Sequence, residues 1–248
     1  MLDQVAAALK GARRVVALTG AGISAESGVP TFRGAGGLWR RFRAEDLATP
    51  EAFARDPALV WEWYGWRRSQ IATALPNAGH LVLARFESRF PDFLLLTQNV
   101  DGLHRRAGSR SLVELHGNIW RARCSAEPSR VFDQTAWSGG EPLAAATGEP
   151  LPRCPCGALL RPDVVWFGES LNPDDVARAT RAVRECDVLL AIGTSASVYP
   201  VAAFPAMARR AGARVVEVNV EATPLTPQAD FVLRGPAGTV LPAVEARL

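Results

Sequence analysis

Short, mainly apolar runs recur along the chain and set its predicted architecture. They cover residues 15–18, 93–96, 112–115, 188–192, 215–218 and 231–233. Runs of this length, rich in valine, isoleucine and leucine, are typical of strands buried on both faces. Stretches with helical periodicity separate most of them. The alternation predicts an α/β fold with a Rossmann-like, doubly wound parallel sheet.

Caps and prolines indicate where the helices begin. Thr49 before Pro50 opens one helix, and Pro57 opens a second that is rich in tryptophan. Asn172 before Pro173 opens a helix that runs to about residue 185. Further helices are expected before Gly11, over 77–90, over 201–210 with a break near Pro205, and after Gly238.

Two stretches interrupt the alternation of strands and helices. Residues 35–76 show helical signals only, and residues 118–152 show little periodicity. We therefore expect two insertions, 35–76 and 118–159, to form a smaller domain. The large domain would comprise 1–34, 77–117 and 160–248, with the main core resuming at Pro162.

Polar residues follow several of the predicted strands, where open α/β sheets bind their ligands. The stretch Gly20-Ala21-Gly22 predicts a tight turn with close backbone approach to a ligand. Backbone N–H groups there, with a short helix behind them, would attract a pyrophosphate. The fingerprint for dinucleotides is met only in its looser form, because no acidic residue ends a second strand about twenty residues on. A glycine-rich turn without a ligand is the alternative.

Composition narrows the classes of function. The chain has 248 residues, 48% of them hydrophobic, and a net charge of +3 without a basic run. This favours a globular protein and gives no indication of nucleic-acid binding. No stretch approaches the length of a membrane span, and no secretion signal opens the chain, so we expect a cytoplasmic protein. The four cysteines are too few for a disulfide framework and suggest thiols or metal ligands.

Several ordered blocks resemble the sirtuins, which are NAD-dependent protein lysine deacylases. They are Gly20-Ala21-Gly22-Ile23-Ser24 with Gly28-Val29-Pro30-x-Phe32-Arg33, Thr97-Gln98-Asn99-Val100-Asp101-x-Leu103-His104, Leu115-His116-Gly117, Val164 to Glu169, Gly193-Thr194-Ser195 and Asn219-x-Glu221. The resemblance extends from about residue 15 to residue 242. It implies that NAD and an acylated lysine meet between the two domains, and that the products are nicotinamide, free lysine and O-acyl-ADP-ribose.

His116 is the candidate general base, because imidazole titrates near neutral pH and can accept a proton from a ribose hydroxyl. The alternative is a core histidine, which is how we interpret His80 and His104. Asn99 and Asp101 resemble the pair that binds the nicotinamide carboxamide, although both residue types also cap helices. Phe32 and Arg33 would close over the reacting sugar.

The complete NAD-binding set that the resemblance implies also includes the adenosine side of the site. Its members are Gly20, Ala21, Gly22, Ile23, Glu26, Phe32, Arg33, Gln98, Asn99, Asp101, Gly193, Thr194, Ser195, Asn219, Glu221 and Ala237.

Tyr64 and Arg67 lie about one turn apart on a predicted helix, so both can face the same way. A guanidinium and a phenol together could bind a carboxylate. The pattern resembles the sirtuin class that removes succinyl and malonyl groups, with Ala48 leaving room in the pocket. An amphipathic helix with a solvated arginine is the alternative. The expected substrate-binding residues are Ala48, Tyr64, Arg67, Val165, Trp166, Phe167, Gly168 and Glu169.

The metal signature of the family is incomplete in this chain. Sirtuins carry two cysteine pairs for a structural zinc, but here Glu127 stands where a second cysteine is expected after Cys124. Cys154 and Cys156 have a single residue between them. The second insertion therefore resembles a degenerate zinc ribbon. Three thiolates with Glu127 could complete a site, or the metal could be lost, and we expect the domain to fold without it.

The sequence thus predicts an NAD-dependent lysine deacylase that acts on succinyl or malonyl groups faster than on acetyl groups. A general protein deacetylase and an NAD-dependent ADP-ribosyltransferase are the alternatives, with a non-catalytic NAD or ADP-ribose sensor as a third. Acylated lysines of proteins are the expected partners. A monomer is compatible with the sequence, which does not determine the oligomeric state.

Overall fold

The protein is described by a computed structural model that covers residues 1–31, 43–133 and 150–248. Six strands form a parallel sheet in the order β3-β2-β1-β7-β8-β9. The strands are β1 (Arg14–Thr19), β2 (Asp92–Thr97), β3 (Leu112–Glu114), β7 (Val188–Ile192), β8 (Arg214–Asn219) and β9 (Phe231–Arg234). This confirms the α/β fold with a doubly wound parallel sheet.

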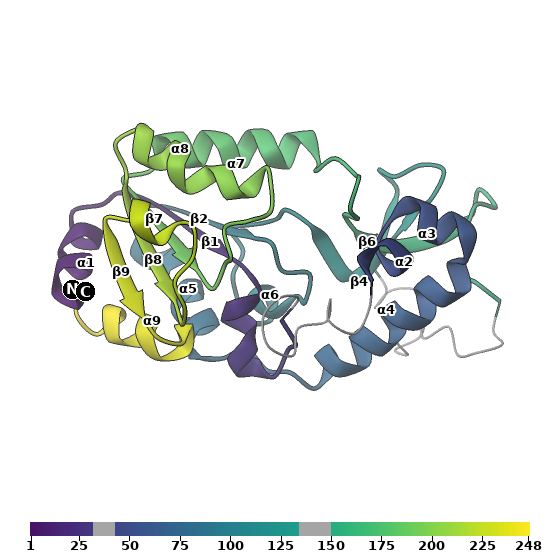
Figure 1. Cartoon of the computed structure of the whole chain (residues 1–248), viewed down its shortest axis with the longest axis horizontal. Coiled ribbons are helices and arrows are strands. Elements are labelled where there is room, and N and C mark those ends of the chain that lie inside the picture. The colour runs from purple at the N-terminus through teal and green to yellow at the C-terminus, as the bar shows by residue number, and fades with distance from the viewer. Residues whose placement is uncertain (32–42, 134–149) are drawn as a thin grey trace.

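Alternate residues of the central strands face two separate cores. In β1, Val15 and Ala17 belong to one apolar cluster, whereas Val16 and Leu18 belong to the other. Helices α1 (Leu2–Lys10), α5 (Ala78–Arg89) and α9 (Ala237–Glu245) cover the first face. Helices α7 (Pro173–Glu185) and α8 (Phe204–Arg210) cover the second face (Figure 1). The short helix η4 (Val201–Ala203) precedes α8, in agreement with the break expected near Pro205.

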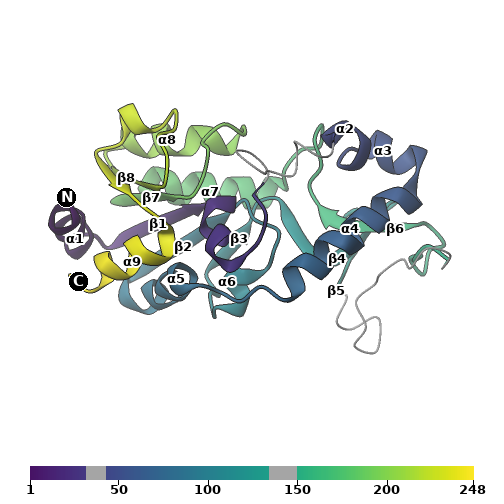
Figure 2. The same cartoon turned by 60° about the horizontal axis from the view of Figure 1, so that its bottom comes forward.

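A second group of elements lies at one end of the sheet (Figures 1 and 2). It combines α2 (Ala44–Leu47), α3 (Pro50–Arg55) and α4 (Pro57–Ala72) with an antiparallel sheet in the order β5-β4-β6. The strands are β4 (Gly117–Cys124), β5 (Val131–Asp133) and β6 (Leu160–Val164). Their apolar side chains share a third core cluster with the helices.

The expectation that the main core resumes at Pro162 is wrong for β6. Leu160, Arg161 and Pro162 pair with β4 and so belong to the small sheet. The small sheet escaped sequence analysis because its strands carry charged residues. Arg121 and Arg123 of β4 form ion pairs with Asp163 of β6, so charged side chains lie where an apolar pattern was sought.

The direction in which strands are added to the main sheet reverses between β1 and β7. From β1 the chain continues to β2 on one side, and later returns to β7 on the other side. Loops after β1 and β7 therefore lead away in opposite directions, which is where ligands bind in such sheets. The short helices η1 (Ala21–Ser27), α6 (Leu103–Arg106) and η5 (Thr226–Gln228) follow β1, β2 and β8. None of the described helices has both the length and the apolar character needed to cross a bilayer.

Candidate active site

The glycine loops after β1 and β7 pack directly on each other. The Gly22 N–H donates to the Gly193 carbonyl at 2.8 Å, and the Gly20 N–H donates to Ile192. A Cβ atom at Gly22 would lie 2.7 Å from the Gly193 Cα, and Gly193 itself has a φ of +56°. These glycines therefore permit contact between two protein loops. The backbone N–H groups of Gly20 and Gly22 were expected to be exposed. They instead form hydrogen bonds within the protein.

Side chains join the ends of neighbouring strands into a continuous polar rim. Gln98 donates to the Thr194 hydroxyl at 2.9 Å, and Asn219 donates to the Thr194 carbonyl at 3.0 Å. The ends of β2, β7 and β8 are thereby fixed relative to one another. Ser195 and Glu221 are exposed beside this rim. The sequence-predicted residues Gln98, Thr194, Ser195, Asn219 and Glu221 thus share one edge of the sheet.

Ser24 is the centre of a buried hydrogen-bond cluster with Asn99 and Asp101. Its hydroxyl donates to Asp101 Oδ2 at 2.7 Å and accepts from Asn99 Nδ2 at 3.2 Å. Asn99 Nδ2 also donates to the Gly20 carbonyl, and Asp101 Oδ1 accepts the Leu103 N–H. Burial raises the pKa of Asp101, and hydrogen bonds from Leu103 and Ser24 oppose part of the shift. The two residues predicted to bind nicotinamide are therefore held side by side.

His80 completes this cluster, although sequence analysis assigned it a structural role. Its Nδ1 accepts the Asn77 N–H at 3.3 Å, so the proton resides on Nε2, which lies 3.3 Å from the Ser24 hydroxyl. Burial lowers the pKa of His80 to about 4, which keeps the ring neutral. The capping motif at the start of α5 was the only local signal for His80, and it says nothing of Ser24.

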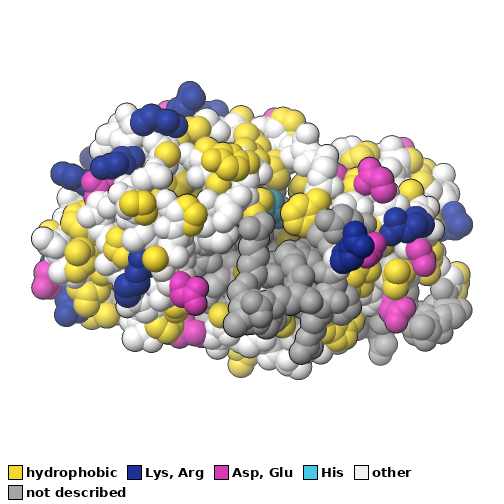
Figure 3. Space-filling view, viewed as in Figure 1, with side chains coloured by type: hydrophobic (Ala, Val, Ile, Leu, Met, Phe, Trp, Pro, Cys, Tyr) yellow, Lys and Arg dark blue, Asp and Glu magenta, His cyan; other side chains and the backbone are white. Residues whose placement is uncertain are grey.

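His116 lies in the turn between β3 and β4, next to the polar rim. Its Nδ1 is 3.1 Å from the Gln98 carbonyl, which can only accept, so Nδ1 carries the proton and Nε2 is left basic. Burial lowers the pKa of His116, and the bond to Gln98 opposes part of this shift. The space-filling view in Figure 3 shows a histidine surface in the hollow between the two parts of the molecule. His80 and His104 are buried, whereas His116 is partly exposed.

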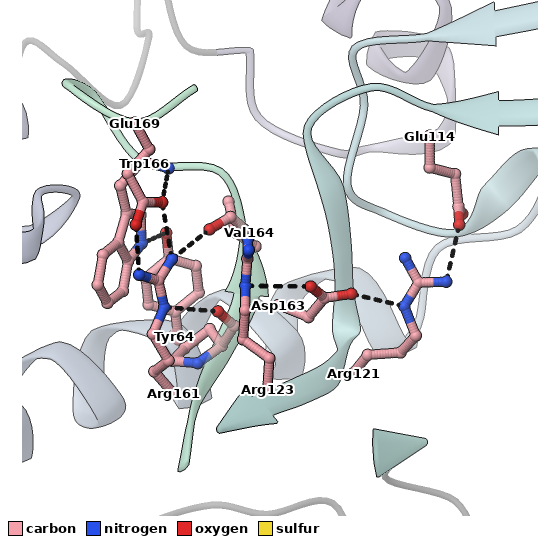
Figure 4. A network of polar contacts seen from close by, with 10 residues as sticks. Tyr64, Glu114, Arg121, Arg123, Arg161, Asp163, Val164, Trp166 and Glu169 are labelled. Carbon is pink, nitrogen blue, oxygen red and sulfur yellow. Dashed lines mark hydrogen bonds and ion pairs between the residues drawn. The ribbon is translucent and has the colours of Figure 1, made fainter. Parts of the chain in front are cut away.

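The segment after β6 connects His116 with the helices of the small domain. The Val165 N–H donates to the His116 carbonyl at 2.9 Å, and the Phe167 N–H donates to the Ala48 carbonyl at 3.0 Å. The side chain of Phe167 is exposed, as is Gly168. Glu169 is bound within the protein, since its carboxylate pairs with Arg161 and accepts the Trp166 N–H (Figure 4).

Tyr64 and Arg67 are both buried on α4, so the interpretation of Arg67 as a solvated arginine is wrong. The Arg67 guanidinium lies 4.9 Å from the Trp63 ring centroid and 5.5 Å from the Tyr64 ring centroid. Burial lowers the pKa of Arg67, whereas Tyr64 and Asp101 favour its charged form. Arg67 lines a small pocket, whose other residues are Val29, Pro30, Trp66, Gln70 and Ile71.

Three residues of the predicted NAD-binding set offer no free side chain to a ligand. The side chains of Ile23 and Ala237 lie in the core of the main sheet, so only their backbone can face a ligand. Glu26 accepts the Gly238 N–H at 2.6 Å and so ties η1 to the start of α9. Phe32 and Arg33 lie outside the described residues.

Three cysteines converge at the far end of the small sheet. The sulfur atoms of Cys124, Cys154 and Cys156 all lie within 4.8 Å of one another. Glu127 is turned to Arg130, with an ion pair of 2.9 Å, and Arg130 in turn donates to the Cys154 sulfur. Burial opposes ionisation of Cys154, but bonds from Cys156, Cys124 and Arg130 lower its pKa to about 7. Three cysteine sulfur atoms therefore lie close enough together to hold a zinc ion, whereas Glu127 does not join them.

Comparisons with known proteins agree with this arrangement. The Sir2 family pattern matches residues 20–200. An NAD-dependent protein deacylase of Aquifex aeolicus is 52% identical over 235 residues, which are 93% of either chain. The mitochondrial NAD-dependent protein deacylase sirtuin-5 of Canis lupus familiaris is 47% identical over 93% of this chain and 80% of its own.

Among solved structures, a complex of a Sir2 homologue with NAD superposes with a TM-score of 0.89 and 46% identity. The match covers 99% of this chain and 93% of that one. The family pattern, the relatives and the fold all identify the same group of proteins. The chain belongs to the Sir2 family, the sirtuins.

Proposed function

We propose that this protein is an NAD-dependent protein lysine deacylase that acts on acidic acyl groups such as succinyl and malonyl. The observation that carries the acyl preference is the buried pair of Tyr64 and Arg67 on α4. A buried guanidinium is costly unless an anion or acceptors stabilise it. A carboxylate at the tip of an acyl chain matches the charge and the planar donors of a guanidinium, whereas an acetyl group carries no charge.

The rim of polar side chains offers hydrogen-bonding groups suited to NAD, and it lies at the strand ends where such sheets bind nucleotides. Asn99 uses its Nδ2 for Gly20 and Ser24, which leaves Oδ1 as an acceptor for the carboxamide of nicotinamide. Asp101 lies beside it through the shared bond to Ser24. Asn219, Ser195 and Glu221 line the other end of the same edge, where the adenosine half would bind. When bound, NAD supplies the electrophilic ribose carbon that accepts the acyl oxygen as nicotinamide leaves.

The residues of this chain would then orient the substrates and move the proton. His116 Nε2 is free of the proton that Nδ1 holds against Gln98, so it can accept one from a ribose hydroxyl. The backbone of 165–168 runs between His116 and Ala48. An acylated lysine lying along this segment would bring its carbonyl toward the base and its acyl tip toward Tyr64 and Arg67.

Matched peptides carrying succinyl-, malonyl- or acetyl-lysine test the proposal. We expect kcat/KM for the acidic acyl groups to exceed that for acetyl by at least about tenfold, the effect of one charged hydrogen bond. Equal or faster deacetylation would contradict the acyl preference but leave the deacylase activity intact.

Release of nicotinamide, measured with and without acyl peptide, separates the alternatives. A deacylase releases nicotinamide only in proportion to the acyl groups it removes. An ADP-ribosyltransferase releases it with an unacylated protein acceptor, and a sensor does not release it. Equimolar free lysine peptide and nicotinamide are the result expected for this chain.

The cysteine cluster has no role in this chemistry. We propose that the small domain folds without metal, since its core cluster joins α3, α4, β4 and β6 through apolar side chains. Zinc, where it binds, would be held by Cys124, Cys154 and Cys156. A cytoplasmic location remains our expectation, and a monomer remains compatible with the sequence.

A further inference from the structure

A bidentate ion pair holds the indole ring of Trp166. Arg161 binds the two carboxylate oxygens of Glu169 at 2.5 and 2.8 Å (Figure 4). The guanidinium carbon of Arg161 lies 3.5 Å from the centre of the Trp166 ring, a close cation–π contact. Phe53 of α3 packs against the same ring with a centroid distance of 5.4 Å. The indole is therefore fixed by a charged group and an aromatic group together.

The same ion pair also fixes the backbone on both sides of Trp166. Arg161 donates to the Val164 carbonyl, and Glu169 accepts the Trp166 N–H, each at 2.8 Å. Burial of Glu169 opposes its ionisation, but the bonds from Arg161 and Trp166 outweigh this and lower its pKa. Glu169 is thus ionised at neutral pH. We call Arg161 and Glu169, with the turn between Val164 and Glu169 that they hold, the clamp.

Trp166 connects the clamp to Tyr64 by a hydrogen bond. Its indole N–H donates to the Tyr64 hydroxyl at 2.9 Å, and both side chains are buried. The Arg67 guanidinium lies 5.5 Å from the centre of the Tyr64 ring. A phenol oxygen that accepts the indole N–H keeps its own hydrogen for another partner. An acyl carboxylate is a partner of the required kind.

We propose that the clamp sets the acyl selectivity of this protein by positioning the Tyr64 hydroxyl through Trp166. The inference rests on the acidic-acyl preference proposed above. Arg161 and Glu169 act as positioning residues, because their side chains bind each other and the backbone of the turn. Without the indole N–H, the Tyr64 hydroxyl can turn its hydrogen elsewhere and no longer serves the carboxylate.

A double-mutant cycle tests the coupling. The variants W166F, Y64F and W166F/Y64F are compared by kcat and KM on succinyl- and acetyl-lysine peptides. Y64F removes only the hydroxyl, whereas W166F removes the indole N–H together with part of the ring. We expect W166F to raise KM for the succinyl peptide about threefold to tenfold, the effect of one hydrogen bond, and to raise it by more than KM for the acetyl peptide. In the Y64F background the effect of W166F should be smaller, because the hydrogen bond is already absent.

E169Q tests the clamp itself, and E245Q is its matched control. Glu245 forms a similar two-bond pair with Arg85 on the surface, between α9 and α5. E169Q should raise KM for succinyl peptide in the same direction as W166F, while E245Q should not. If E169Q does not fold, as judged by thermal unfolding, the Trp166–Tyr64 cycle still tests whether Trp166 positions the Tyr64 hydroxyl.

The outcomes are distinguishable. Additive effects of W166F and Y64F, or equal losses on both peptides, would overturn the positioning role while the acyl preference of the unmodified chain stands. An unmodified chain that prefers acetyl peptide would overturn the proposed preference, and the clamp inference with it.

Discussion

Two buried polar clusters lie at opposite ends of the candidate site and differ in how their polar atoms are hydrogen-bonded. Ser24, His80, Asn99 and Asp101 form the nicotinamide cluster, where each hydroxyl, amide and carboxylate has a partner inside the group or in the adjacent backbone. Tyr64, Arg67 and Trp166 form the acyl cluster, which carries the charged Arg67 and whose phenol accepts the Trp166 N–H. The charge of Arg67 favours the ionised form of Asp101, against the effect of burial.

Under the proposed function, the two clusters separate reaction from selection. The nicotinamide cluster comes from η1, α5 and the end of β2, all attached to the main sheet. The acyl cluster comes from α4 and the turn after β6, both in the small part of the molecule. A change in the acyl cluster can therefore alter which acyl group binds without moving the base or the NAD site.

The largest effect is expected for His116→Ala, which removes the proposed general base. Loss of a general base typically costs roughly 10²–10⁴-fold in rate. The loss should be of similar size for succinyl, malonyl and acetyl peptides, because the base serves the ribose and not the acyl tip. Peptide turnover followed by mass spectrometry measures this. A variant that loses only one acyl activity would break the comparison between the two clusters.

Arg67→Met should have the next largest effect and act on selection only. A hydrogen bond to a charged group contributes roughly 1.5–3 kcal/mol, so kcat/KM for succinyl and malonyl peptides should fall by roughly 10- to 150-fold. Acetyl peptide should be turned over at nearly the original rate. Arg85→Met, an exposed arginine of α5, is the control and should change neither. A uniform loss across the three peptides would assign Arg67 a structural role instead.

The sequence predicted the elements that carry the nicotinamide cluster better than those that carry the acyl cluster, for a physical reason. Strands such as β1 and β7 are buried on both faces, so continuous apolar runs mark them, and the polar residues that follow mark the sheet edge. Strands β4 and β6 bury Arg161 and Asp163 in ion pairs, and a pattern of apolar residues cannot detect them.

Contacts between distant residues were also outside the reach of local patterns. Ser24 meets His80 and Asp101 across intervals of 56 and 77 residues, and no signal near Ser24 indicates either contact. The spacing of Tyr64 and Arg67 correctly placed both on one helix. Their burial depends on the third core cluster, which the helix alone does not specify.

The pH dependence provides a smaller effect that belongs to the reaction end. The base must be neutral, and burial lowers the pKa of His116 below 6.5, so its neutral form persists to lower pH than that of a free imidazole. As pH falls through this lowered pKa, kcat/KM should fall by about tenfold per unit. The inflection should lie below pH 6.5 for acetyl and succinyl peptides alike. An inflection above 6.5, or one that differs between the peptides, would contradict the assignment of His116.

Metal removal should have the smallest effect, because neither cluster contacts the cysteines. Cys124 and Cys154 are buried within the third core cluster, whose aromatic and aliphatic side chains stabilise the small sheet without metal. We expect purified protein to contain less than one zinc per chain. A chelator should shift the thermal midpoint by no more than about 2–4 °C, equivalent to about 1 kcal/mol for a chain of this size. Cys156→Ser, which removes the exposed thiol of the three, should unfold at nearly the same temperature. One stoichiometric zinc whose removal unfolds the small domain would contradict this, and would make the acyl cluster dependent on the metal through the sheet that carries Trp166.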